Sequence, residues 1–195
     1  MNPMDESGEA APALLSDVRR LIEQARAHVA SAANSAQTFL YWQVGERIRR
    51  EVLGEARADY GEQIVSTLST QLVQAYGQSF GLRSLRRMVQ FSEAFADAQM
   101  VAALSRELSW SHFIEILPLK QPLEREFYAE MCRIERWSVR ALRERIGSQL
   151  YLRSSIAKKP ERVIAQELSH LREGGQITPD LVFRDPYMLD FLGLP

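Results

Sequence analysis

The sequence predicts an all-α domain built from several helices. Glycine and proline are scarce, at 10 and 8 of 195 residues, whereas β folds rich in turns need more of both. Apolar residues recur three and four positions apart along most of the chain, as they do on one face of an α-helix. Because 46% of the residues are hydrophobic and 25% are charged, the composition is that of a globular protein and not of a disordered one.

We expect three parts in chain order. Residues 1–13 are acidic and small, which predicts a disordered tail and argues against a signal peptide. Residues 14–152 hold the periodic apolar stripes and predict the helical domain. Residues 153–195 predict a connector helix, opened by Pro160, and an apolar C-terminal segment.

Within the helical domain, each expected helix follows from an apolar stripe and its end signals. The first two are separated by a break or cap at Asn34 and Ser35. Ser109 and Ser138 are expected N-caps, and Pro122 is expected as a first helical residue. The expected helices span residues 14–33, 36–52, 61–76, 82–96, 97–108, 110–117, 122–134, 139–151 and 160–171.

A glycine-bounded turn at residues 77–81 leads into a helix that carries an arginine row. At 100 degrees per residue, this row lies apart from the apolar face. Its members are Arg83, Arg86, Arg87 and Gln90. A turn followed by such a helix is what a helix-turn-helix protein presents to DNA, so we expect helix-turn-helix-like units centred on 61–96 and 121–151. The alternative is a solvated helix face whose arginine stems cover the core.

The second unit repeats the first only in part. Val139 to Arg143 repeats the order apolar, Arg, small, Leu, Arg found at 82–86, which adds Arg140 and Arg143 as candidate nucleic-acid contacts. Glu144 and Gly147 stand where the first row has Arg87 and Gln90. The loss of positive charge favours packing or a dimer contact at this second unit over DNA binding.

The charge distribution allows a polyanion such as nucleic acid to bind to one segment only. The net charge of the chain is −1, so no global basic signal points to nucleic acid. Residues 79–160 nevertheless carry 14 basic residues against nine acidic ones, which makes this segment the plausible face for phosphates. Nearly all the cations are arginine, which suits bidentate phosphate and base contacts, although a GC-rich genome would give the same bias.

No catalytic set is visible in the sequence. His28, His112 and His170 lack metal-ligand spacing, and Cys132 is expected to be a core thiol. No nucleotide-binding glycine motif is present. Pro179 and Asp180 could open a nuclease motif, but no lysine follows Lys159 to complete it. We therefore expect no enzyme activity, metal or cofactor in this chain. With a single cysteine and no membrane span, we expect a cytoplasmic protein.

Seven stretches in order resemble the N-terminal domain of the YhcG-like family, and together they cover nearly all of residues 14–194. They are FLYWQVGERI (39–48), DYGEQIVSTLSTQL (59–72), YGQSFGLRSLRRM (76–88), LSWSHFIEIL (108–117), EREFYAEM (124–131), WSVRALRERIGSQLYLR (137–153) and DPYMLDFLGL (185–194).

The resemblance implies a helical, helix-turn-helix-like domain of a bacterial protein that binds DNA or assists assembly. Full-length members of the family continue into a PD-(D/E)xK nuclease domain, and they are often found near restriction or other defence genes. This sequence stops where that domain would begin, so none of the family's catalytic acids or lysine can be carried over. Gly81 also stands where relatives usually have a serine N-cap, at a cost of only a few tenths of a kcal/mol.

Two functions are therefore expected, in order of preference. The first is a non-catalytic DNA-binding or targeting module of a truncated or split nuclease, with DNA as ligand and a nuclease domain or subunit in another chain. The alternative is a protein-interaction or oligomerisation module without nucleic acid. In that case, Leu189, Phe191 and Leu192 in the apolar C-terminal segment are the expected contacts of a homo-oligomer.

Overall fold

A computed structural model describes residues 6–53, 58–154 and 159–174 of the chain. Within these ranges the structure contains α-helices, one short 3-10 helix and no strand, which confirms the all-α prediction. None of the helices in the described ranges is both long and apolar enough to cross a membrane. Leu189, Phe191 and Leu192, as well as Pro179 and Asp180, lie outside the described residues.

The first element is one long helix, α1 (Glu6–Leu53), where the sequence predicted two. The predicted break at Asn34 and Ser35 is wrong, because the helix runs through both residues. Asn and Ser are only weakly unfavourable inside a helix. The Ser35 hydroxyl also lies 3.1 Å from the Ser105 hydroxyl, so its polar atom has a partner outside the helix. The helix begins at Glu6, ahead of the expected start at Leu14.

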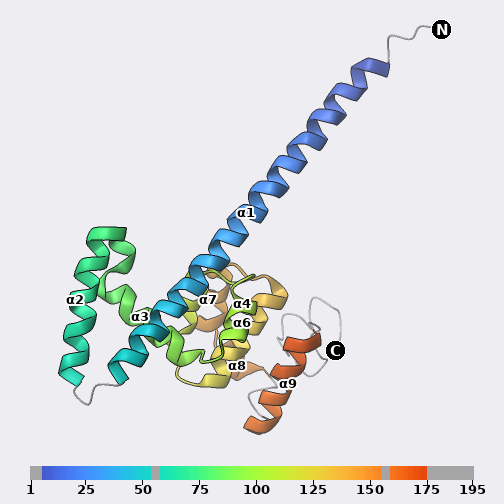
Figure 1. Cartoon of the computed structure of the whole chain (residues 1–195). Coiled ribbons are helices and arrows are strands. Elements are labelled where there is room, and N and C mark those ends of the chain that lie inside the picture. The colour runs from blue at the N-terminus through green and yellow to red at the C-terminus, as the bar shows by residue number, and fades with distance from the viewer. Residues whose placement is uncertain (1–5, 54–57, 155–158, 175–195) are drawn as a thin grey trace.

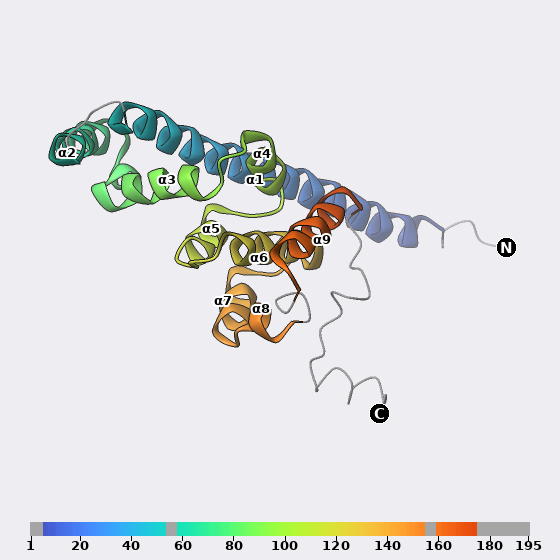
Figure 2. The ribbon, with the colours of Figure 1, turned by 90° about the horizontal axis from the view of Figure 1, so that it is seen from below.

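The two halves of α1 have different surroundings (Figure 1). All residues from 12 to 33 are exposed, and we call this part the arm. Residues 34–51, which we call the anchored half, pack against the rest of the molecule. From this half Tyr41, Trp42 and Ile48 are buried. In Figure 1 the arm projects away from the other helices, and Figure 2 shows the same extension from below.

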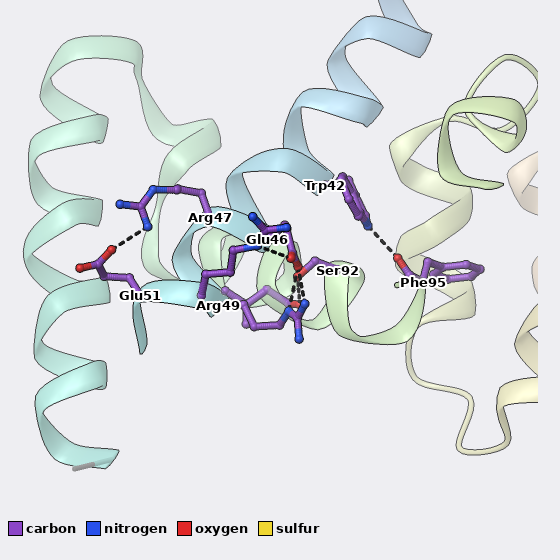
Figure 3. Close-up of polar contacts among 9 residues, drawn as sticks. Trp42, Glu46, Arg47, Arg49, Glu51, Ser92 and Phe95 are labelled. Carbon is purple, nitrogen blue, oxygen red and sulfur yellow. Dashed lines mark hydrogen bonds and ion pairs between the residues drawn. The ribbon is translucent and has the colours of Figure 1, made fainter. Parts of the chain in front are cut away.

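The anchored half crosses α3 (Leu82–Ala94) at Gly45, where the two backbones meet. A Cβ atom at Gly45 would lie 1.8 Å from the Met88 carbonyl oxygen, so only glycine fits there. One helical turn away, the indole N–H of Trp42 donates a 2.7 Å hydrogen bond to the carbonyl oxygen of Phe95 (Figure 3). Together, these contacts set the position and rotation of α3.

A smaller hydrophobic cluster joins α1, α2 (Ala58–Tyr76) and α3, with α2 and α3 connected by the 3-10 helix η1 (Gln78–Phe80). Its buried members are Tyr41, Ile48, Val65, Leu85 and Met88. The predicted turn at 77–81 is confirmed, and Gly77 adopts φ 90°, a conformation that favours glycine.

The larger cluster unites the later helices with the anchored half. These helices are α4 (Ala98–Leu104), α5 (Trp110–Ile116), α6 (Pro122–Glu135), α7 (Val139–Gly147), α8 (Leu150–Arg153) and α9 (Glu161–Gly174). Pro122 opens α6 as predicted, and the Ser138 hydroxyl accepts a hydrogen bond from the Ala141 N–H, as expected of an N-cap. Figure 2 shows α5 and α6 as a layer next to the one formed by α1 and α3.

The helix predicted over residues 139–151 is interrupted. It ends at Gly147, and Gln149 adopts a left-handed conformation with φ 54° before α8 begins. Because glycine is a weak helix former, the expected helix is least stable at Gly147 and ends there. The break lets Leu150 and Tyr151 turn into the core, where both are buried. The Tyr128 hydroxyl then accepts a hydrogen bond from the Tyr151 N–H.

Ion pairs and hydrogen bonds of charged side chains connect α9 to α6. The Glu130 carboxylate, whose side chain is only 2% exposed, accepts hydrogen bonds from Arg133 at 2.7 Å and from Arg172 at 3.1 Å. Arg133 also donates a 2.7 Å hydrogen bond to the carbonyl oxygen of Leu171 near the end of α9. A buried carboxylate with two cationic partners is compensated, so this network has a structural explanation.

Candidate nucleic-acid interface

Helix α3 presents one face to solvent because its opposite face is buried. Leu85, Met88, Phe91 and Ser92 are the buried residues of this helix. The exposed side consists of Arg83, Arg86, Gln90 and Glu93, and Arg87 is half-buried at its edge. Four members of the predicted row thus lie on or beside one strip, and Glu93 extends that strip with a negative charge that the prediction did not include.

The backbone starts α3 without a side-chain cap. The Gly81 carbonyl oxygen accepts hydrogen bonds from the N–H groups of Ser84 and Leu85, at 2.8 and 3.0 Å. Gly81 has an extended conformation, with φ −59° and ψ 158°. The helix start therefore survives the glycine, as expected, and Arg83 lies in its first turn.

The polar partners of the α3 row differ from residue to residue. Arg86 forms an ion pair with Glu62 of α2. The Gln90 amide nitrogen lies 3.4 Å from the carbonyl oxygen of Leu117, so this side chain reaches toward the end of α5. Arg83 forms no ion pair with any residue that the structure describes, and the same holds for Arg87.

Glu115 of α5 connects the two predicted arginine rows. Its carboxylate accepts hydrogen bonds from Arg143 of α7 at 2.6 and 3.2 Å. The hydrogen bonds from Arg143 hold the pKa of Glu115 below its usual value, and the positive charge of Arg87 lowers it further. The structure therefore brings Arg87 and Arg143 toward the same carboxylate. Arg140 instead pairs with Glu144 of its own helix at 3.2 Å.

These ion pairs decide which arginines remain available to a phosphate. Exposed ion pairs typically contribute only about 0–1 kcal/mol, so the pairs of Arg86 and Arg140, exposed on both sides, can open at little cost. The pair of Arg143 is bidentate, and the Glu115 side chain is only 24% exposed. Breaking it would leave a half-buried carboxylate without its main partner. Arg143 thus has a structural function in the free protein.

Of the other candidates in the sequence, His112 and Cys132 have structural explanations. His112 accepts a hydrogen bond from the Ser109 N–H at Nδ1, 3.0 Å away, and its Nε2 lies 2.9 Å from the carbonyl oxygen of Trp137. Burial raises the pKa of the Cys132 thiol to about 12, which keeps it protonated, as expected of a core thiol. In the described part of the chain, no three His, Cys, Asp or Glu residues cluster as metal ligands would.

A comparison with protein families shows to which family this chain belongs. The family model described as the DUF1016 N-terminal domain matches residues 17–153. The chain belongs to this family. That match covers α2 to α8 and η1 completely, so the surface described above lies within the family domain.

The chain has a relative in Escherichia coli (strain K12), the protein named "Putative nuclease YhcG". The two are 28% identical over 204 residues, which cover 89% of this chain and 54% of that protein. The chain thus spans about half the length of its relative. No solved structure was found to match the chain.

Sequence reasoning found the arginine rows but missed their acidic partners. Glu62 lies 24 residues before Arg86, and Glu115 lies 28 residues before Arg143. Contacts across such separations depend on how the helices pack, and no local pattern encodes them. Gly45 was missed as well, although an isolated glycine inside a helical pattern is a recognised sign of close packing.

Proposed function

We propose that this DUF1016 N-terminal domain binds duplex DNA through α3, and that it targets a nuclease without being catalytic itself. The observation that carries the proposal is the exposed strip of α3, where Arg83 and Arg86 point to solvent and Arg83 has no ion-pair partner among the described residues. Arg87 at its edge adds a third cation, and Gln90 a hydrogen-bonding group of the kind that reads adenine.

The mechanism that this strip supports starts with phosphate contacts. Arginines that replace condensed counterions on DNA gain affinity when salt is low, and the planar guanidinium suits phosphate oxygens. Arg86 would exchange its exposed Glu62 partner for a phosphate. The first turn of α3, led by Arg83, would be the part of a helix-turn-helix-like unit that enters the groove. Arg140 would add an outer phosphate contact, whereas Arg143 remains bound to Glu115.

The link to a nuclease is supported by the name of the E. coli relative and by its greater length. The nuclease would be a further domain or another chain, and the resemblance to YhcG-like proteins extends the proposal to restriction or defence. In this reading, the domain supplies position on the DNA, and the cleavage chemistry belongs to that other part.

The test is binding of the purified chain to a labelled DNA duplex over a salt series. The triple variant Arg83→Ala, Arg86→Ala, Arg87→Ala should bind more weakly. Its plot of log affinity against log salt should be shallower by about 0.9 for each lost phosphate contact. The matched control replaces Arg20, Arg26 and Arg47 by alanine, because all three form exposed ion pairs on α1. Equal loss in both variants, or no binding at low salt, would contradict the proposal.

A further inference from the structure

The arm of α1 carries an apolar stripe that nothing in the described structure covers. Its large apolar side chains are 42–66% exposed. They are Leu14, Leu15, Val18, Leu21, Ile22 and Val29. Most monomeric proteins do not keep a continuous apolar stripe in water, and in proteins most of the stability of a helix comes from the packing of its apolar face. The arm therefore has the features of a surface that binds a partner.

The spacing along this stripe is that of a coiled coil. Positions 15, 18, 22, 25, 29 and 32 alternate in steps of three and four, and each holds Leu, Val, Ile or Ala. We call these six residues the arm seam. A repeat of seven residues with two apolar positions keeps one seam facing a partner helix over the whole length. The arm spans about 33 Å, from 22 residues at 1.5 Å each.

We propose that the arm pairs with the arm of a second copy of this chain, in antiparallel orientation, to form a homodimer. This inference does not depend on DNA binding. The evidence for the antiparallel dimer is the order of large and small residues along the arm seam. In an antiparallel pair centred between Ile22 and Ala25, Leu15 faces Ala32 of the second copy, Val18 faces Val29, and Ile22 faces Ala25. Each layer then has a similar volume, as good core packing requires.

A parallel pair would pack less evenly. It would place each seam residue opposite itself, so that Ala25 and Ala32 would form two layers of alanine only, while Leu15 and Ile22 would form two large layers. Layers of unequal size leave voids between the helices or force them apart. The arm seam is therefore complementary to a second arm seam that runs in the opposite direction.

A groove at the base of the arm agrees with the antiparallel arrangement. It lies where α1 meets α4, and its apolar lining includes Ala32, Ala36, Phe39 and Ala102. In the antiparallel pair, the leucine-rich start of one arm reaches this place on the other copy, where Leu14 and Leu15 can fill it. A parallel pair would bring these leucines to the opposite end.

The charges on the arm favour a protein partner over a membrane surface. Residues 12–33 hold three arginines and two acids, whereas helices that lie on anionic membranes have a strongly basic polar face. Arg20 pairs with Asp17 at 2.9 Å and Arg26 with Glu23 at 3.2 Å. The polar side of the arm is therefore nearly neutral and suited to water.

The first experiment measures the dimer by sedimentation over a wide dilution range. The wild-type chain should be dimeric at high concentration, and Ile22→Asp should raise the dissociation constant at least tenfold. Gln24→Asp introduces the same charge on the far side of the arm and should leave the constant unchanged. A strict monomer at all concentrations would overturn the proposal, and so would vesicles of anionic lipid binding a monomeric arm.

Cross-linking then tests the orientation. Val18→Cys and Val29→Cys are made separately in the full chain, whose own Cys132 is only 2% exposed. In an antiparallel pair, mild oxidation should link the two variants when they are mixed, and neither variant should link to itself. Self-linking of each variant alone would show a parallel pair and contradict the layers described above.

Discussion

The arm and the anchored half of α1 belong to one helix but have opposite environments. Residues 12–33 are all exposed, whereas the anchored half contains Gly45 and Trp42 in close contact with α3 and its C-terminal end. Both halves have apolar residues at helical spacing. What distinguishes the anchored half is a glycine that permits backbone contact and an indole that bonds to a carbonyl. Apolar periodicity alone therefore identifies a helix but does not show what it packs against.

The largest effect is expected where the two helices touch. Gly45→Ala would place a Cβ atom 1.8 Å from the Met88 carbonyl oxygen, which forces α1 and α3 apart and opens both hydrophobic clusters. We expect the free energy of unfolding to fall by about 3 kcal/mol or more, measured by chemical denaturation. Gly147→Ala is the control, because a Cβ atom there meets nothing within 4 Å. It should change stability by less than about 1 kcal/mol. Equal effects of the two variants would rule out the close crossing.

A smaller effect is expected at Trp42. Trp42→Phe removes the donor to the Phe95 carbonyl oxygen, at present 2.7 Å away, and leaves a buried acceptor unpaired. We expect a loss of about 1–3 kcal/mol in the free energy of unfolding. Trp137→Phe serves as control, because that indole is only half-buried at the edge of the larger cluster, with the Arg145 guanidinium carbon 5.3 Å from its ring centre. A Trp42 variant as stable as this control would mean that the hydrogen bond contributes little.

Acid should weaken the anchored half through Glu46. Hydrogen bonds from Arg49, which Figure 3 shows beside Glu46, and from Arg50 lower the pKa of Glu46 below its usual 4.5. Because the folded-state pKa is the lower one, the stabilisation is complete above pH 4.5 and is lost as the pH falls through the folded-state pKa. Glu46→Gln should therefore flatten the decline of stability with acid. Glu23→Gln is the control, because both side chains of its ion pair with Arg26 are exposed and such pairs contribute little to stability.

The smallest effect on folding is expected in the arm. Leu21→Ala removes a side chain that is 59% exposed. We call the part of the molecule outside the arm the body. At dilutions where the monomer predominates, the free energy of unfolding of the body should change by less than about 0.5 kcal/mol. A loss comparable with that of Trp42→Phe would mean that the arm packs on the body of its own chain.

The sequence predicted the fold class and most helix boundaries because those depend on neighbouring residues. Pro122 and Ser138 act at the helix ends where they stand. Among the boundaries that were wrong, two have reasons in tertiary structure: Ser35 finds a partner in Ser105, and the break before Leu150 lets that side chain reach the core. The arginine strip on α3 follows from helical geometry. Glu62 and Glu115 depend on how distant helices meet, which a single sequence does not encode.

The hydrogen bond of Trp42 also has an optical consequence. The three tryptophans, Trp42, Trp110 and Trp137, all lie outside the arm. Intrinsic fluorescence therefore reports only the body, and most directly the crossing of α1 and α3, while far-ultraviolet circular dichroism counts the helical turns of the arm as well. If the arm unwinds on its own when the dimer dissociates, dilution will reduce the dichroism and leave the fluorescence unchanged. Fluorescence and circular dichroism measured on one sample can thus separate the association of the arms from the folding of the body.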